Sequence, residues 1–329
     1  MRSFRWGIIG PGRIAQKFAN CVEALPNSKV QAIASRSSSN LHRLVSDLHA
    51  DVGYQSYEEL ASDQNVDAIY IATPHRFHYD NAMLCLKYGK PLLIEKAFTV
   101  NSHEAVNLAA EAKQRGVFLM EAMWTRFLPV YRQVKQWLDS GKIGEVRLVI
   151  SSLGFIAKRD IKDRLLNPEL AGGTVLDLGV YAMAVSQMVF NKPPVYIKAQ
   201  GFVGETGVDE AISTSLDYGD GSYSQFACTF LTNPSMQVDI FGTKGKITIL
   251  PVYNSSERAS ITIKGHEKSV HMPHRINGFE YQIEEAQRCI KSGKLESPLM
   301  PLSDSIDNMR VLDEIRSQIG VSYAFEKII

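Results

Sequence analysis

The chain has 329 residues, of which 45% are hydrophobic and 22% are charged. This length exceeds what one hydrophobic core usually supports and predicts two domains of roughly 120 to 200 residues each. The 36 Lys and Arg residues nearly balance the 35 Asp and Glu residues, so the chain as a whole offers no strong field for nucleic acid or for an anionic membrane. The composition excludes a disordered or low-complexity protein.

The sequence shows no sign of export or of membrane insertion. The amino terminus leads straight into a glycine-punctuated apolar stretch that lacks the length and cleavage chemistry of a signal peptide. Neither does any uncharged apolar run approach the roughly 20 residues that a membrane-spanning helix needs. The cysteines have neither metal-ligand spacing nor nearby His partners; they are Cys21, Cys85, Cys228 and Cys289. We expect a cytoplasmic protein with reduced thiols, whose partner is a small-molecule substrate rather than nucleic acid or membrane.

The first 121 residues alternate between short apolar strands and amphipathic helices. Strands are predicted at 5–10, 30–34, 67–72, 91–94 and 117–121, and helices at 14–25, 40–50, 79–88 and 102–115. Continuous apolar strands separated by helices are typical of a parallel, doubly wound sheet. We therefore predict an α/β fold that begins with an NAD(P)-binding Rossmann domain at residues 1–121.

After Glu121 strands predominate and alternate between polar and apolar residues. One helix is predicted at 129–140, followed by strands at 145–155, 195–203, 212–218, 223–231, 236–241 and 246–250. Helices at 174–189, 278–292 and 303–318 are expected to cover one face of this sheet. Residues 122–329 thus read as a substrate-binding α+β domain with a large, mostly antiparallel sheet. Its other face, if apolar, predicts a homodimer or a higher homo-oligomer.

The segment from Gly10 to Ala15 has the pattern G-x-G-x-x-A between the first strand and the first helix. Glycines there permit a tight turn and a close approach of phosphate, and the helix amino terminus favours a pyrophosphate. Gly10, Gly12, Arg13 and Ile14 are therefore candidate cofactor-binding residues.

The end of the second strand bears on the choice between NAD and NADP. An NAD-preferring site usually places an acid there for the ribose 2′-hydroxyl, whereas this chain has Ser35, Arg36 and Ser37. These side chains suit a 2′-phosphate. NADP is therefore the favoured cofactor, and NAD remains an alternative. Arg36 could also be a solvated loop cation with no role in cofactor binding.

Thr73, Pro74 and His75 end the third strand, at the carboxyl edge where open parallel sheets bind ligands. We expect them to contact the cofactor. His78 follows closely, but without a carboxylate or a third ligand at metal spacing we predict no metal site. For these histidines we expect a cofactor contact or a helix-capping role.

Two further elements carry groups suited to proton transfer. Glu95 and Lys96 follow the fourth strand, at the same cofactor-binding edge. Asp177 and Tyr181 are four residues apart and so share a helix face. When each element is considered alone, Lys96 could equally be an ordinary surface lysine, Asp177 a helix-capping residue and Tyr181 a packed core residue.

The glycine turn, the Glu95-Lys96 element and the Gly172-Gly173-x-x-x-Asp177-x-Gly179-x-Tyr181 element together resemble the glucose-fructose oxidoreductase and inositol dehydrogenase (Gfo/Idh/MocA) family. Residues 95–101 and 121–127, with Tyr181, are most similar to its dimeric dihydrodiol dehydrogenase and NADP-dependent D-xylose dehydrogenase branch. Many other members carry histidine at position 181, and Ala97 departs from a common Glu-Lys-Pro.

This resemblance implies that Lys96 and Tyr181 are catalytic and that Asp177 orients the substrate or the lysine. The chemistry agrees, because oxidising an alcohol requires a base, and a tyrosine with a pKa of about 10 needs a nearby cation to serve at neutral pH. For Trp124 the resemblance suggests an apolar substrate wall, which Phe155 would also suit, although either side chain could be core. The run from Lys158 to Arg164 mixes both charge signs and reads as a solvated loop.

The function that we expect is hydride transfer between NADP(H) and the CH–OH or C=O carbon of a sugar, a diol or a related small polar substrate. One alternative is an inositol or amino-sugar dehydrogenase of the same family. Another is a non-catalytic NADP-sensing regulator, which the joint presence of Lys96, Asp177 and Tyr181 disfavours. Hydride transfer within a tightly held cofactor is a weaker reading.

Overall fold

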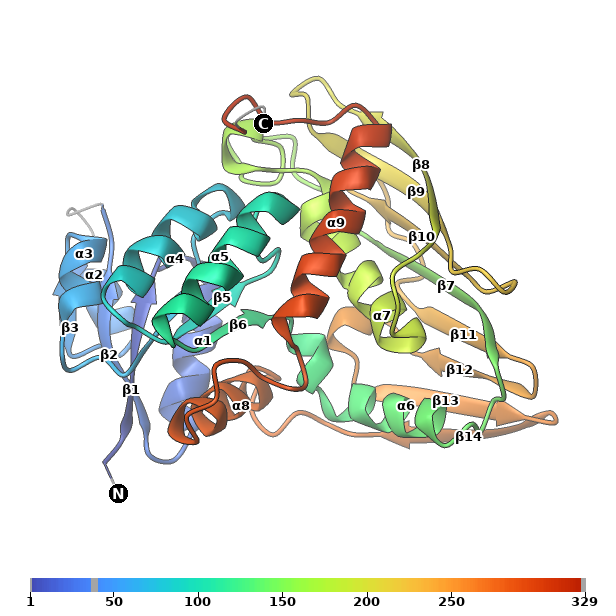
Figure 1. Ribbon diagram of the computed structural model, residues 1–329, viewed down its shortest axis with the longest axis horizontal. Coiled ribbons are helices and arrows are strands. Elements are labelled where there is room, and N and C mark those ends of the chain that lie inside the picture. The colour runs from blue at the N-terminus through green and yellow to red at the C-terminus, as the bar shows by residue number, and fades with distance from the viewer. Residues whose placement is uncertain (1, 37–40, 327–329) are drawn as a thin grey trace. The chain divides into compact units, whose positions relative to one another are not determined.

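The computed structural model describes residues 2–36 and 41–326 of the chain (Figure 1). It divides into two compact units. The first unit consists of Met1–Trp124 and Arg275–Ile306, and the second of Thr125–His274 and Asp307–Ile329.

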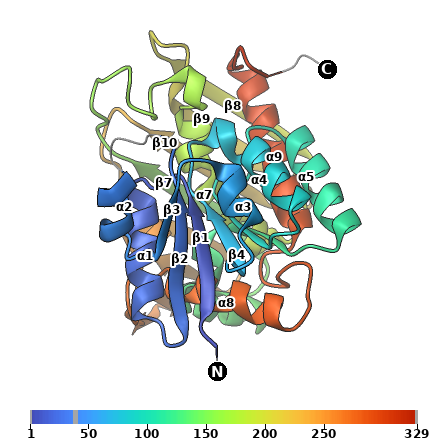
Figure 2. The same cartoon turned by 90° about the vertical axis from the view of Figure 1, so that its left-hand side faces the viewer.

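The first unit contains a six-stranded parallel sheet in the order β3-β2-β1-β4-β5-β6. Its strands are β1 (Phe4–Ile9), β2 (Ser28–Ala34), β3 (Val52–Tyr54), β4 (Ala68–Ile71), β5 (Leu92–Glu95) and β6 (Leu119–Ala122). Figure 2 shows α1 (Arg13–Ala24) and α2 (Leu41–Asp47) on one side of the strands, and α3 (Tyr57–Ser62), α4 (His78–Lys87) and α5 (Ser102–Arg115) on the other. The predicted Rossmann domain is confirmed.

The apolar pattern explains these elements. All four residues of β4, β5 and β6 are buried, as expected of parallel strands covered on both faces. The buried residues of α1 recur at helical spacing. The prediction omitted β3 and α3, because β3 is three residues long and only partly buried, which leaves almost no periodic signal.

Residues 275–306 belong to the first unit. The chain therefore does not divide once between residues 121 and 122, as the predicted domains do. The Leu119 N–H donates to the Leu295 carbonyl at 3.0 Å, and Ser305 Oγ donates to Glu121 Oε2 at 2.7 Å. Helix α8 (Glu280–Lys291) contacts α1 within this unit. The expectation that this helix covers the antiparallel sheet was therefore wrong.

The second unit contains an eight-stranded sheet in the order β14-β13-β12-β11-β7-β10-β9-β8. The strands are β7 (Val146–Gly154), β8 (Tyr196–Val203), β9 (Asp209–Asp217), β10 (Tyr223–Thr229), β11 (Val238–Gly242), β12 (Gly245–Ile249), β13 (Arg258–Ile263) and β14 (His266–His271). Within the described strands of this second sheet only β7 and β10 pair in parallel, which confirms the mostly antiparallel sheet. The hairpin of β13 and β14 was missed because β14 is nearly all exposed and polar.

Helices α6 (Pro129–Asp139), α7 (Val180–Phe190) and most of α9 (Leu302–Gln318) lie on one face of this sheet (Figure 1). Residues 168–190 are long and apolar enough to cross a membrane by length and composition, yet 89% of the apolar window is buried inside the protein. This stretch is therefore a core helix of the second unit. Within this stretch, a π-helical turn, η5 (Val175–Gly179), precedes α7.

Candidate functional site

The glycine turn after β1 has the geometry that a dinucleotide needs. Gly10 has φ +84°, and a Cβ on it would lie 2.7 Å from the Thr73 nitrogen, so only glycine lets these two loops meet. At Gly12, apart from chain neighbours, no heavy atom of the described residues lies within 4 Å of where a Cβ would stand. Arg13 and Ile14 begin α1 and are exposed. This open cradle at a helix amino terminus fits a pyrophosphate.

Arg36 lies exposed just past the end of β2, whereas Ser35 beside it is buried. The guanidinium stands 5.0 Å from the centre of the Phe77 ring and 5.7 Å from that of Tyr57. Two aromatic faces therefore orient this cation by cation–π contact. Ser37, the third predicted residue here, lies outside the described residues.

The loop after β4 places Thr73 and His75 at the carboxyl edge with 8% and 6% of their surface exposed, and Pro74 is half-buried. His78 has no exposed surface, so it lies beneath this edge. Its Nε2 lies 2.7 Å from the Thr73 carbonyl and its Nδ1 lies 2.9 Å from the Ala97 carbonyl. Burial lowers the pKa of His78 against the effect of these carbonyls. Its structural role is to join two loops of the site.

Glu95 and Lys96 stand at the carboxyl end of β5, as predicted. The Tyr70 hydroxyl donates to the buried Glu95 carboxylate, and Lys96 is half-buried. The peptide bond between Lys96 and Ala97 is cis, so Ala97 occupies a cis position without being proline.

Trp124 is 7% exposed and packs within the first unit. Its ring lies 5.2 Å from that of Phe279, and Lys17 Nζ lies 4.1 Å from the Trp124 centroid and 4.7 Å from the Phe279 centroid. Burial lowers the pKa of Lys17, although the nearby Glu95, Cys21 and Glu280 act to raise it. Most of the Trp124 side chain is therefore covered by packing within the first unit, as expected of a core residue.

In the second unit, Asp177 and Tyr181 are carried by η5 and the first turn of α7, and both are more than 90% buried. Asp177 lies on a π-helical turn, a widened turn that recurs at functional sites. The start of this turn is held by Asp209, whose Oδ2 accepts from Thr174 Oγ1 at 2.6 Å and from the Val175 N–H at 2.7 Å.

Asp177 has a partner that the sequence did not reveal. Arg164 Nη1 donates to Asp177 Oδ1 at 3.0 Å, and the Arg164 side chain is 45% exposed. The pKa of Arg164 is raised, chiefly by the charge of Asp177. The prediction that the whole run 158–164 is a solvated loop was wrong for Arg164 and for Arg159, which pairs with the buried Glu210. Alternating charges in a sequence do not show which of them meets a buried carboxylate.

Phe155 is 37% exposed, and its ring lies 5.4 Å from that of Phe230. The structure thus brings the glycine turn, Thr73, His75 and Lys96 together at one edge of the first unit, and Asp177 and Tyr181 together in the second. The predicted pairing of Lys96 with Tyr181 joins residues of different units and stays a prediction.

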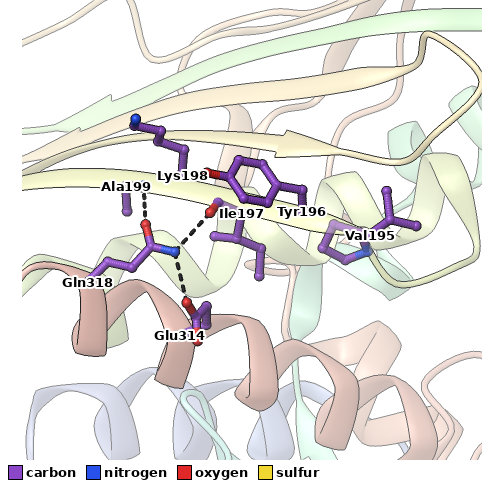
Figure 3. A pocket seen from close by; sticks show the side chains of 8 residues that line it. Val195, Tyr196, Ile197, Lys198, Ala199, Glu314 and Gln318 are labelled. Carbon is purple, nitrogen blue, oxygen red and sulfur yellow. Dashed lines mark hydrogen bonds between the residues drawn. The ribbon is translucent and has the colours of Figure 1, made fainter.

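A separate hollow of about 540 Å³ lies between β8 and the end of α9 (Figure 3). Gln318 spans it, because its Oε1 accepts from the Ala199 N–H and its Nε2 donates to the Ile197 carbonyl, each at 2.8 Å. The amide side chain thereby covers part of the open edge of β8. None of the predicted site residues lines this hollow.

Comparison with known proteins agrees with this geometry. The model of the oxidoreductase family with an NAD-binding Rossmann fold matches residues 4–123, and that of the GFO/IDH/MocA C-terminal domain matches residues 131–248. The trans-1,2-dihydrobenzene-1,2-diol dehydrogenase of Mus musculus is 35% identical over 338 residues, covering 99% of each chain.

Solved structures share the whole fold. A 3-ketoreductase from Actinomadura kijaniata, complexed with NADP and TDP-benzene, superposes with a TM-score of 0.86 at 24% identity, over 97% of this chain and 98% of that one. A levoglucosan dehydrogenase complexed with NADH and L-sorbose superposes with a TM-score of 0.88 at 14% identity, over 97% of each chain. The chain therefore belongs to the Gfo/Idh/MocA family of NAD(P)-dependent oxidoreductases.

Proposed function

We propose that the protein is an NADP-dependent dehydrogenase that interconverts the CH–OH and C=O forms of a sugar, a diol or a related small polar substrate. The observation that carries the proposal is that Asp177, on the widened turn η5, and Tyr181, on the first turn of α7 directly after it, are both buried. A relative that is 35% identical along the whole chain is named for diol oxidation, and a structural neighbour was solved with a ketose sugar.

The residues that would hold the cofactor fit NADP. The Gly10–Gly12 turn would take the pyrophosphate at the amino terminus of α1. Arg36, oriented by Phe77 and Tyr57, would take the 2′-phosphate. When bound, the cofactor supplies or accepts the hydride.

The preference for NADP is tested by titrating NADPH and NADH fluorescence with the wild type and with Arg36→Ala. NADPH affinity should fall at least about tenfold, since a charge-assisted phosphate contact is worth 1.5–3 kcal/mol, while NADH affinity stays within about twofold. Arg115→Ala, which removes an exposed arginine at the end of α5, is the matched control. Equal losses for both cofactors contradict the assignment.

The chain's own residues would move the proton. Tyr181 Oη accepts the hydroxyl proton when the alcohol is oxidised and returns it when the carbonyl is reduced. Lys96, as an ammonium, stabilises the phenolate and the developing alkoxide. Asp177 orients the substrate or the lysine. In support, the ketoreductase with the same fold was also solved with a single lysine or a single tyrosine replaced.

The chemistry is tested by following nicotinamide absorbance with aldoses, cyclic trans-diols, inositols and dicarbonyls. Turnover of an aldose or a trans-diol supports the proposal, and turnover of inositols alone favours the inositol alternative. Tight cofactor binding with no turnover supports a sensing role. Lys96→Met and Tyr181→Phe should lower kcat at least about a thousandfold and preserve cofactor binding, whereas Lys192→Met and Tyr196→Phe, at exposed positions, should leave kcat unchanged.

We propose further that the protein acts in the cytoplasm as a homodimer formed through the uncovered face of the large sheet. All four cysteines are free thiols and buried, in keeping with a reducing compartment. Ile150, Tyr196, Phe202 and Tyr223 are exposed strand residues of the second unit, although a hollow on β7 to β10 is lined largely by Ser, Thr and Gln. Light scattering after size exclusion tests the dimer: a monomer mass at micromolar concentration contradicts it.

A further inference from the structure

The proposed chemistry gives no role to Arg164 of the second unit. Its guanidinium donates to Asp177 at 3.0 Å, while only 7% of the Asp177 side chain is exposed. A carboxylate with so little exposed surface needs a cation or several donors to stay ionised. Arg164 supplies that charge from a loop rather than from the helix.

The backbone around Arg164 is held in place on both sides of the residue. The Leu165 N–H donates to Asp163 Oδ1 at 3.0 Å, and the Leu165 carbonyl accepts from the Gly173 N–H at 2.9 Å. A Cβ on Gly172 would lie 2.7 Å from the Arg164 carbonyl oxygen. The Gly172-Gly173 pair thus lets the loop approach the start of η5, and this approach brings the guanidinium to Asp177.

Besides Lys96 of the first unit, which the proposed function pairs with Tyr181, two kinds of group act on Tyr181 within the described part of the second unit. Tyr131 of α6 and Tyr253 of η6 (Tyr253–Ser255) are fully buried, and burial raises the pKa of both phenols, with a further contribution from Tyr181. Both are therefore neutral. Charge comes from Asp177, one turn before Tyr181, and from Arg164, whose pKa is raised by Asp177 first and also by Tyr181.

We infer that Arg164 is a positioning residue of the dehydrogenase: it holds Asp177 ionised and oriented, and it cancels the negative charge of Asp177 beside Tyr181. The inference rests on the proposed function of Tyr181. Without Arg164 the pKa of Asp177 would rise, but a carboxylate that is ionised at the pH where the phenol titrates would oppose the formation of a second negative charge there. With Arg164 in place, Asp177 can orient the substrate or Lys96 without making Tyr181 a poorer base.

The experiment is the pH dependence of kcat/KM for oxidation, measured with the wild type, Arg164→Met and Asp177→Asn. In Arg164→Met the pKa of the group that must be deprotonated should rise by about one unit or more, which is a tenfold loss at limiting pH. In Asp177→Asn the pKa of this group should fall, because the positive charge of Arg164 then acts on Tyr181 without the negative charge of Asp177 to offset it. Shifts of opposite sign are not produced by general damage to the loop.

Two controls separate charge from structure. Arg164→Lys keeps the cation and should keep the pH profile within about 0.3 unit of the wild type. Arg159→Met removes another arginine of the same loop, one paired with the buried Glu210, and should leave the profile unchanged. If Arg164→Met folds poorly, Arg164→Lys and Asp177→Asn still test the inference, because its failure appears as an unshifted or upward-shifted profile in Asp177→Asn.

The inference is overturned if Arg164→Met keeps the wild-type profile, or if Arg159→Met shifts it equally. The proposed function fails in a different way, namely when the wild type turns over no sugar or diol or when Tyr181→Phe retains full activity.

Discussion

Thr174 and Asp209 are joined by a hydrogen bond of 2.6 Å in the interior of the second unit. The same carboxylate oxygen accepts from the Val175 N–H, while Oδ1 has no hydrogen-bond partner among the described residues. Burial raises the pKa of Asp209 to about 6, even though Thr174 and Val175 lower it. A proton on Oδ1 leaves Oδ2 able to accept both bonds, so Asp209 can anchor the turn that carries Asp177 in its neutral form below about pH 6 as well as in its ionised form above it.

Asp209 should make the protein less stable as the pH rises from about 4 to about 6. The unfolded chain releases this proton near pH 4 and the folded chain near pH 6, so the free energy of unfolding falls across that interval, by about 3 kcal/mol at most, and is level above it. Asp209→Asn should abolish this contribution. Urea unfolding from pH 4 to 7.5 measures it, with Asp217→Asn on the same strand as control; an unchanged slope in Asp209→Asn contradicts the assignment.

Glu280 should show the opposite dependence. Its carboxylate accepts from the N–H groups of Arg275, Ile276, Asn277 and Gly278 at 2.7 to 3.1 Å. Burial acts to raise the pKa of Glu280, but these donors outweigh it and the pKa is lowered. The stabilisation is therefore complete above about pH 4.5 and is lost as the pH falls through the lower, folded pKa.

Glu280→Gln should reduce the free energy of unfolding by about 2–4 kcal/mol at pH 7, because an amide nitrogen cannot accept from backbone N–H groups. Glu284→Gln, on the exposed side of the same helix, should cost less than about 0.5 kcal/mol. Chemical denaturation of both variants compares them directly, and equal stability of the two would refute the prediction.

Gly10 and Gly12 should separate folding from cofactor binding. Gly10→Ala forces a Cβ to within 2.7 Å of the Thr73 nitrogen at φ +84°, so Tm should fall by several degrees. Gly12→Ala, at φ −94° and with open space around it, should keep the wild-type Tm. Its methyl group would occupy space that the pyrophosphate needs, so NADPH affinity should fall tenfold or more. Thermal scans with a fluorescence titration distinguish the two; normal NADPH binding by Gly12→Ala would show that phosphate lies elsewhere.

His78→Ala should destabilise the first unit and disturb Lys96. The Thr73 and Ala97 carbonyls would lose their partner and a buried cavity would form, at a cost of about 2–4 kcal/mol. Since Ala97 adjoins Lys96, kcat should also fall. His103→Ala, at an exposed position of α5, is the control. Wild-type stability and kcat in His78→Ala would mean that the two loops hold their positions without this ring.

The sequence predicted those parts of the site that depend on neighbours in the chain. The Gly10–Gly12 turn, Lys96 at the end of β5 and the spacing of Asp177 from Tyr181 are local features, and the structure places each on the expected element. Arg164, Asp209 and the return of residues 275–306 were not predicted, because each depends on a contact between segments that are separated by other elements.

The sequence by itself determined the parallel and antiparallel sheets and the family, because strand and helix periods and glycine turns are set by residues close in the chain. Only the tertiary structure decided that Arg164 is the counter-ion of Asp177, that His78 is buried beneath the carboxyl edge of the parallel sheet, and that Asp209, 32 residues beyond Asp177, anchors the turn that carries Asp177. The physical reason is that burial and the pairing of charges are properties of the folded interior, where a side chain's partner is chosen by packing and not by sequence distance.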